Sequence, residues 1–222
     1  VSVIDELPPG RQEIKTVHRN EMRRAHVMDF IRTEVDKGRQ AYIVYPLIEE
    51  SEKMDYESLV AGYEQVKTFF PEHKYRIAMV HGRQERELRE RNMKRFVEGD
   101  AQVLVATTVI EVGVDVPNAS VMLVESAERF GLSQLHQLRG RVGRGAEQSY
   151  CILLTGTKLS KESGERMKIM TSTSNGFIIA EKDLAMRGPG DLYGTKQSGV
   201  FRFKLADIVL DTAILEQTRL AA

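Results

Sequence analysis

The sequence has few of the residues that cross-link a chain or break its helices. Its 222 residues include one cysteine, no tryptophan and only six prolines. A single cysteine, Cys151, excludes an internal disulfide and suits a reducing compartment. Because Cys151 lies in the apolar run 150–154, we expect a buried strand residue rather than a reactive thiol.

The sequence also lacks an apolar stretch long enough to span a membrane, and it shows no secretion signal. We therefore expect no membrane association. The 32 basic and 32 acidic side chains give a formal net charge of zero. Any contact with nucleic acid must then come from local patches rather than from a positive field over the whole surface. The chain opens on Val1 without a methionine, which suggests a piece excised from a longer protein.

Two periodicities alternate along the first two thirds of the chain. Short, mostly β-branched apolar runs predict buried strands, and the charged segments between them have helical spacing. The predicted strands are 41–45, 77–80, 103–106, 121–124 and 151–154, and the predicted helices are 21–35, 56–70, 84–97 and 133–138. Alternating strands and helices predict an α/β fold, a parallel sheet flanked by helices.

The alternation of strand and helix patterns ends at about residue 156. A helical segment at 161–171 precedes a glycine-rich, loop-like stretch at 187–199, and a last helix is predicted at about 205–220. We therefore predict a main α/β domain at 1–156 and an appended, mostly helical element at 157–222.

The segment 134–144 (QLHQLRGRVGR) places three arginines, Arg139, Arg141 and Arg144, on a turn punctuated by glycines. An arginine guanidinium matches the oxygens of a phosphate and stays charged in proteins. Glycines allow the backbone to turn tightly and to approach a ligand closely. Two or more arginines aimed at one point would stabilise the charge that develops during phosphoryl transfer. The alternative is a basic loop that contacts solvent or the phosphates of a nucleic acid.

Ligands of open parallel sheets bind beyond the carboxyl ends of the strands, and three loops here follow predicted strands. One begins at His81, which we interpret as a structural hydrogen-bonding residue. Another contains Thr107 and Thr108, whose hydroxyls and backbone N–H groups could hold a phosphate or could cap a helix. It continues to Asp115, which could bind a ribose hydroxyl or simply form a turn. The third loop leads from residue 125 to the arginine run.

The sequence has no G-x-x-x-x-G-K-[ST] loop and no apolar strand that ends in paired acids, so no motif in it would hold the β- and γ-phosphates with their magnesium. If the arginines serve ATP hydrolysis, they must act on a nucleotide whose other contacts come from elsewhere.

The order of these motifs resembles the second RecA-like lobe of a superfamily 2 helicase. The pattern at 81–96, the segment 103–117 (VLVATTVIEVGVDVP) and the segment 137–144 (QLRGRVGR) resemble motifs IV to VI in order and spacing. Residues 176–199 (GFIIAEKDLAMRGPGDLYGTKQSG) resemble the translocation motif shared by the RecG family and the transcription-repair coupling factors. The RGPG form, with the lead-in 127–137, is more similar to RecG. The resemblance covers essentially the whole chain but not the wedge domain or the first motor lobe of that family.

The resemblance implies a role for each matching residue. Arg144 would be the arginine finger on the γ-phosphate of ATP, with Arg141 as its partner. Gln137, Asp115 and Gly113 would lie by the nucleotide, and Glu111 with Gly113 would couple it to the DNA site. Thr107 and Thr108 would contact the DNA backbone. The residues that link ATP-driven closure to movement along duplex DNA would be Arg166, Arg187 and Gln197, on a helical hairpin and loop.

The resemblance also implies the ligands, the partners and the compartment. ATP with magnesium would be held mainly by the first RecA-like lobe, which with the wedge domain belongs to the same protein. The substrate would be forked or branched DNA, including replication forks and Holliday junctions in recombination and repair, in the bacterial cytoplasm close to the nucleoid. The chain alone would then be inactive. Two alternatives remain at this point: the translocase lobe of a coupling factor, and a RecA-like nucleic-acid-binding module without motor function.

Overall fold

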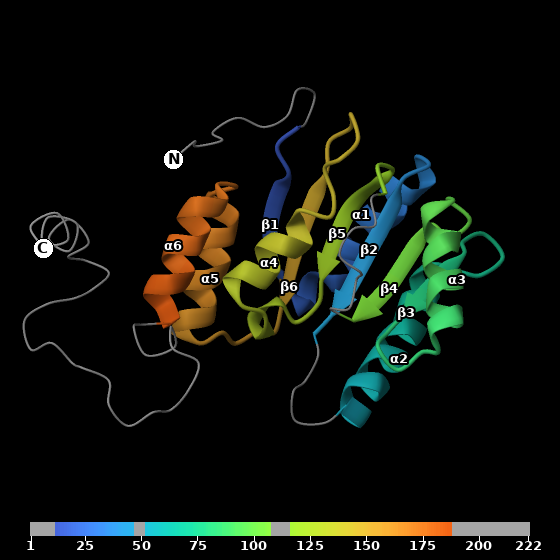
Figure 1. Cartoon of the computed structure of the whole chain (residues 1–222), viewed down its shortest axis with the longest axis horizontal. Helices are drawn as coiled ribbons and strands as arrows, with labels where there is room; N and C mark the ends of the chain where they lie inside the picture. Colours follow the sequence, from blue (N-terminus) through green and yellow to red (C-terminus); the bar gives the residue numbers. More distant parts are fainter. Residues whose placement is uncertain (1–11, 47–51, 108–115, 188–222) are drawn as a thin grey trace, which may run out of the picture.

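The computed structural model describes residues 12–46, 52–107 and 116–187, which form a parallel sheet between two layers of helices (Figure 1). Its strands lie in the order β1-β6-β5-β2-β4-β3, and every neighbouring pair is parallel. The strands are β1 (Lys15–Asn20), β2 (Gln40–Tyr45), β3 (Ile77–Val80), β4 (Val103–Thr107), β5 (Ala119–Val124) and β6 (Tyr150–Thr155). The predicted α/β fold is confirmed, and each of the five predicted strands is present within two residues of its expected bounds.

Helices cover both faces of the sheet. The helices α1 and α2 lie on one face, and α3 to α6 lie on the other (Figure 1). Their bounds are η1 (Glu21–Arg23), α1 (Arg24–Asp36), α2 (Glu52–Phe69), α3 (Arg86–Val97), η2 (Ala127–Arg129), α4 (Leu132–Arg139), α5 (Lys161–Ser172) and α6 (Gly176–Arg187). Among the described residues, no helix has both the length and the apolar character needed to cross a bilayer.

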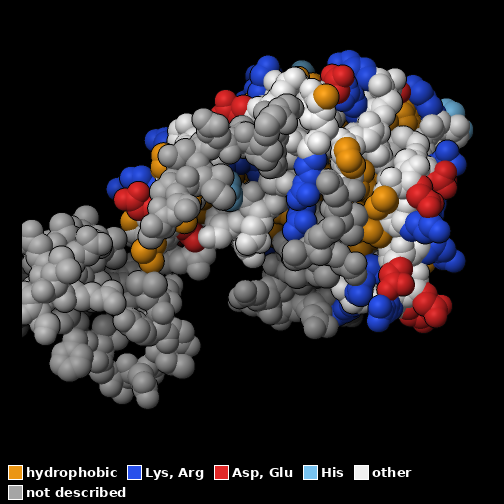
Figure 2. Space-filling model, turned by 45° about the horizontal axis from the view of Figure 1, so that its top comes forward, with side chains coloured by type: hydrophobic (Ala, Val, Ile, Leu, Met, Phe, Trp, Pro, Cys, Tyr) orange, Lys and Arg blue, Asp and Glu red, His pale blue; other side chains and the backbone are white. Residues whose placement is uncertain are grey.

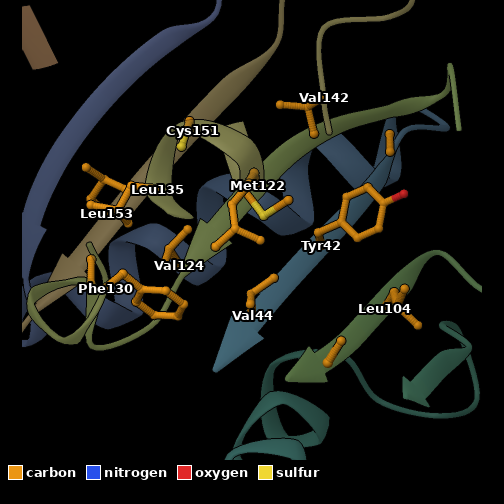
Figure 3. Close-up of a cluster of buried hydrophobic side chains, with 14 of the residues drawn as sticks. Tyr42, Val44, Leu104, Met122, Val124, Phe130, Leu135, Val142, Cys151 and Leu153 are labelled. Atoms are coloured by element: carbon orange, nitrogen blue, oxygen red, sulfur yellow. The ribbon is translucent and has the colours of Figure 1, made fainter. Parts of the chain in front are cut away.

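The strands alternate their side chains between two apolar cores. In β2, Tyr42 and Val44 point into the core under α3 and α4, whereas Ala41 and Ile43 point into the core under α1 and α2. Figure 3 shows the first of these cores. Burial of each large side chain contributes about 1.5–3 kcal/mol, so the two cores stabilise both layers. Cys151 is fully buried in the first core, as predicted, and burial raises the pKa of its thiol to about 12.

Strand β1 was not predicted. Its sequence, KTVHRN, has one large apolar residue, Val17, and no clear alternation. An edge strand pairs on one side only, and β1 pairs with β6 from Lys15 opposite Tyr150 onward. Because no described strand pairs with its other edge, this strand is half-exposed and its sequence needs little hydrophobicity.

The helices α5 and α6 form a helical hairpin, residues 161–187, that packs against α4. Met167, Met170 and Ile179 of this hairpin belong to the same apolar core as the sheet. The boundary predicted at residue 156 stays a prediction. The predicted loop beyond Arg187 and the predicted helix at 205–220 lie outside the described residues.

Candidate functional site

The arginine run begins on α4. Gly131 precedes this helix, and the Gln134 side chain accepts a hydrogen bond of 3.0 Å from the backbone N–H of Gly131. Leu132, Leu135 and Leu138 bury one side of α4 in the sheet core. The apolar spacing therefore fixes which side of the helix faces inward and exposes Gln137 on the opposite side.

The turn after α4 directs two of the three arginines outward. Val142 is fully buried in the first core, as Figure 3 shows. Arg141 is half-buried and Arg144 is exposed. Gly143 has a φ of 80°, and a Cβ there would lie 2.8 Å from the Ile14 side chain, so only glycine fits. The buried valine and the constrained glycine thus fix the turn from which Arg141 and Arg144 extend.

This turn lies at the amino edge of the sheet, the upper edge in Figure 1. The side chain of Gln12, ahead of β1, donates a hydrogen bond of 2.9 Å to the Ala146 carbonyl. A Cβ on Gly145 would lie 2.6 Å from the carbonyl oxygen of Pro117, just before β5. The loop that follows β5 lies at the carboxyl edge, as we expected. The arginines at the end of this segment do not, because α4 runs from that edge back to the amino edge.

The opposite, carboxyl edge holds Thr107. This residue is 3% exposed at the end of β4, and among the described residues its hydroxyl has no hydrogen-bond partner. Thr108, Glu111, Gly113 and Asp115 follow in the sequence and lie outside the described residues. The described chain resumes at Val116, just ahead of β5 on the amino edge. Figure 2, which turns the amino edge toward the viewer, shows Lys and Arg side chains interspersed with Asp and Glu.

A buried ion pair also lies at the carboxyl edge. Glu125, which directly follows β5, is 1% exposed and accepts two hydrogen bonds from the guanidinium of Arg24 on α1. Burial raises the pKa of the Glu125 carboxyl, and Arg24 partly offsets this rise. Tyr45, the register partner of Thr107, ends β2 beside this pair. The pair therefore joins α1 to the end of a central strand.

Replacing Arg24 by methionine should lower the free energy of unfolding by about 3 kcal/mol, because Glu125 then stays buried without its partner. The folded-state pKa of Glu125 would rise further above its unfolded value. The loss should therefore shrink as the pH falls through this raised pKa, because the folded variant then takes up the proton. Urea unfolding at two pH values measures this.

The control for this change is Arg32→Met, because Arg32 pairs with Asp29 on the exposed side of α1 at 2.7 Å. We expect this variant to lose less than about 1 kcal/mol, with little dependence on pH. Equal losses for the two variants would contradict the structural role of the buried pair.

The two arginines predicted to couple ATP hydrolysis to movement lie on the hairpin. Arg166 of α5 donates hydrogen bonds to the carbonyl oxygen of Glu128, at 2.8 Å, and to the hydroxyl of Ser163, at 3.0 Å. It thus ties the hairpin to η2 at the carboxyl edge. Arg187 is the last residue of α6. Gln197 lies outside the described residues.

Arg139, the third arginine of the run, points inward. It is 3% exposed, and its guanidinium donates to backbone carbonyls of the hairpin rather than to a surface site. We had grouped it with the other two as a candidate phosphate ligand, and the structure does not support that grouping. The signal was present in the sequence, because Arg139 follows Leu132 and Leu135 at the i+7 and i+4 positions of one helix face.

Two segments of the sequence match the models of known protein families. Residues 22–146 match the model of the helicase conserved C-terminal domain, and residues 173–222 match the C-terminal part of domain 3 of the ATP-dependent DNA helicase RecG. The chain therefore belongs to the helicase conserved C-terminal domain family. Within that family it is similar to the C-terminal helicase lobe of RecG-type DNA helicases.

Curated relatives extend the similarity over the whole chain. The ATP-dependent DNA helicase RecG of Thermotoga maritima is 50% identical over 220 residues, which span 99% of this chain and 28% of that protein. RecG of Bacillus subtilis is 48% identical over 219 residues, spanning 99% of this chain and 32% of that protein. The chain thus spans about a third or less of the length of the relatives it matches.

Solved structures agree with this. A structure of RecG bound to a three-way DNA junction matches with a TM-score of 0.73 and 46% identity, over 96% of this chain and 27% of that chain. Domain 2 of the DEAD-box helicase Mss116p, bound to an RNA duplex, matches with a TM-score of 0.53 and 18% identity, over 77% of this chain and 68% of that chain. The second likeness concerns the fold alone, and it agrees with the predicted RecA-like sheet.

Proposed function

We propose that this chain is the C-terminal motor lobe of an ATP-dependent translocase that moves along double-stranded DNA. In the full-length protein it would remodel replication forks and Holliday junctions in recombination and repair. The observation that carries this proposal is the half-buried Arg141 and the exposed Arg144 on either side of the buried Val142, in a sequence without a phosphate-binding loop.

The amino edge is the nucleotide side of the proposed site. Guanidinium groups at Arg141 and Arg144 suit the phosphate oxygens of ATP, and Gln137 is exposed on the helix that leads to them. Among the described residues no cluster of His, Cys, Asp or Glu could hold a metal ion. The arginines fit ATP, and its magnesium would be held mainly by the first RecA-like lobe. Hydrolysis of bound ATP supplies the free energy for movement.

The carboxyl edge is the DNA side of the proposed site. Thr107 ends β4 there, and Thr108 follows it. Glu111, Gly113 and Asp115 follow in the sequence, before the described chain resumes at Val116 on the amino edge, and Asp115 would lie near the ribose. Because Thr107 and Val116 lie at opposite edges and are close in the sequence, ATP-dependent closure on one edge would change the contacts made at the other. The DNA contacts would be to phosphates and insensitive to sequence.

The proposed substrate is forked or branched DNA. The relatives named RecG are ATP-dependent DNA helicases, and the RecG of the solved structure is bound to a three-way junction. By this similarity the wedge domain and the first motor lobe would complete the same protein, which would act in the bacterial cytoplasm close to the nucleoid. Arg166, Arg187 and Gln197 would couple closure of the lobes to movement of the DNA.

Replacing Gln197 by alanine in the full-length protein should uncouple the motor. We expect ATP hydrolysis within about threefold of the wild-type rate and fork unwinding reduced by about tenfold or more, because the energy source is intact and its transmission is not. Unwinding and hydrolysis assays on the same forked DNA measure both. Lys204→Ala, outside the translocation motif, is the control and should retain both activities. Normal unwinding by the Gln197 variant would refute its coupling role.

A further inference from the structure

The segment that enters the lobe, residues 12–15, lies against the arginine loop, residues 143–149. We propose that Gln12 and Gln148 clamp the entering segment to the arginine loop, so that the chain arriving from the first motor lobe positions Arg144 for ATP hydrolysis. This inference rests on the proposed motor function and adds two positioning residues to it. Opening or closing of the two lobes would then move the arginine through the chain that connects them as well as through the sheet.

Two glutamines join the segments by reciprocal hydrogen bonds. The Gln12 side chain, on the entering segment, donates to the Ala146 carbonyl of the arginine loop at 2.9 Å. The Gln148 side chain, on the loop, donates in return to the Glu13 carbonyl at 2.8 Å. The partners of the two bonds are 134 and 135 residues apart in the sequence. Hydrogen bonds of neutral side chains are individually modest, so they can restrain a loop without dominating the stability of the lobe.

Backbone and apolar contacts hold both ends of the arginine loop to the same segment. At the end of the loop, the Lys15 N–H donates to the Ser149 carbonyl at 2.9 Å, where the pairing of β1 with β6 begins. At its start, the half-buried Ile14 occupies the space that a side chain on Gly143 would need, since a Cβ there would lie 2.8 Å from Ile14. The entering segment therefore contacts the arginine loop along its whole length.

The arginine loop also contacts the chain just after the residue proposed to lie near the ribose, Asp115. A Cβ on Gly145 would lie 2.6 Å from the carbonyl oxygen of Pro117, two residues beyond Asp115. Glu147 forms an ion pair of 2.7 Å with Arg39, just ahead of β2, but the Glu147 side chain is mostly exposed and such pairs contribute little. The loop is thus held by the entering segment and by Pro117, and loss of the glutamine bonds would weaken the first of these contacts only.

The position of the loop matters because of what Arg144 has to do. Glycines flank Arg144 on both sides, at Gly143 and Gly145, and glycine adds freedom to a backbone. An arginine that stabilises a developing charge acts only when its guanidinium is correctly placed, and a misplacement of about 1 Å can lower a rate by about 10²-fold. The glutamine bonds supply a restraint that the glycines do not. They would therefore affect the rate of the chemical step rather than the binding of ATP or DNA.

The test is the double variant Gln12→Met, Gln148→Met in the full-length protein, because methionine keeps the length of the side chain and donates no hydrogen bond. We expect kcat of DNA-stimulated ATP hydrolysis to fall by about tenfold, while KM for ATP and the affinity for forked DNA stay within about twofold. Gln102→Met is the matched control, since the Gln102 side chain also donates to backbone carbonyls, but to those just ahead of β4. It should keep kcat within about twofold of wild type, and thermal unfolding checks that both variants are folded.

The same double variant in an Arg144→Ala background separates positioning from a structural role. Because the glutamines act through Arg144, their replacement should change the residual rate by less than about twofold once Arg144 is absent, measured by release of radiolabelled phosphate. A tenfold loss in both backgrounds, a change in KM alone or an unchanged kcat would refute the positioning role. If Arg144→Ala by itself left hydrolysis unchanged, the proposed function would fail instead.

A cross-link tests the clamp even if the double variant unfolds. Gln12 and Ala146 are both exposed, so Gln12→Cys and Ala146→Cys can be joined by a short bifunctional thiol reagent in a full-length background without other reactive cysteines. Cys151 is fully buried and should not react. If the entering segment and the arginine loop move together, the cross-linked protein should hydrolyse ATP within about twofold of the same variant before cross-linking. A loss of about tenfold on cross-linking would show that the two segments must separate during the motor cycle, and would overturn the inference.

Discussion

Replacing Arg144 by alanine in the full-length protein should lower the DNA-stimulated rate of ATP hydrolysis by about 10³–10⁵-fold, the range typical of a lost arginine finger. DNA binding should stay nearly unchanged. The reason is geometric, because Arg144 extends from the amino edge of the sheet and Thr107 ends β4 at the opposite edge. A coupled ATPase assay and fluorescence anisotropy with forked DNA measure the two quantities.

The matched control is Arg32→Ala, which removes an exposed arginine from α1, far along the chain from the proposed site. Its hydrolysis rate should remain within about twofold of wild type, as expected for a surface ion pair. If the Arg144 variant hydrolysed ATP at a similar rate to this control, Arg144 could not act on the γ-phosphate.

The isolated chain should hydrolyse no ATP, with or without DNA. Arg141 and Arg144 supply positive charge at one edge, but the sequence has no loop to hold the β- and γ-phosphates and no paired acids for magnesium. Charge stabilisation without a positioned nucleotide and nucleophile gives little acceleration. Turnover by the purified chain, compared with its own Arg144→Ala variant to detect a contaminant, measures this. DNA-stimulated turnover lost in that variant would show a complete active site and contradict the proposal.

Much of the fold could be predicted from the sequence, because buried parallel strands require continuous apolar runs. Residues 103–106 and 121–124 carried that signal, and the strands formed there. Strand β1 carried almost none, since among the described residues it pairs with β6 alone and even Val17 is only partly buried. Such a strand forms because it pairs with a strand that is distant in the sequence. A short stretch of sequence carries no information about that pairing.

The candidate site was predictable in its residue types but not in its placement. The glycines and the alternating arginines at 139–144 indicated a phosphate site, yet helix packing decides which side chains point outward. Val142 and Leu138 bury their side chains, which leaves Arg141 and Arg144 toward solvent and Arg139 inside. The sequence also did not indicate at which edge of the sheet the arginines lie. The direction of α4 depends on its packing against β5 and not on its own sequence.

The most direct test of the account is ATP hydrolysis by the full-length protein on a forked duplex and on a linear duplex of equal length, measured together with strand separation of the fork. The account predicts strong stimulation by DNA, higher on the fork than on the linear duplex, with unwinding that requires hydrolysable ATP. Equal rates with and without DNA, or a fork that stays intact while ATP is consumed, would contradict the assignment of this chain as half of a branched-DNA motor.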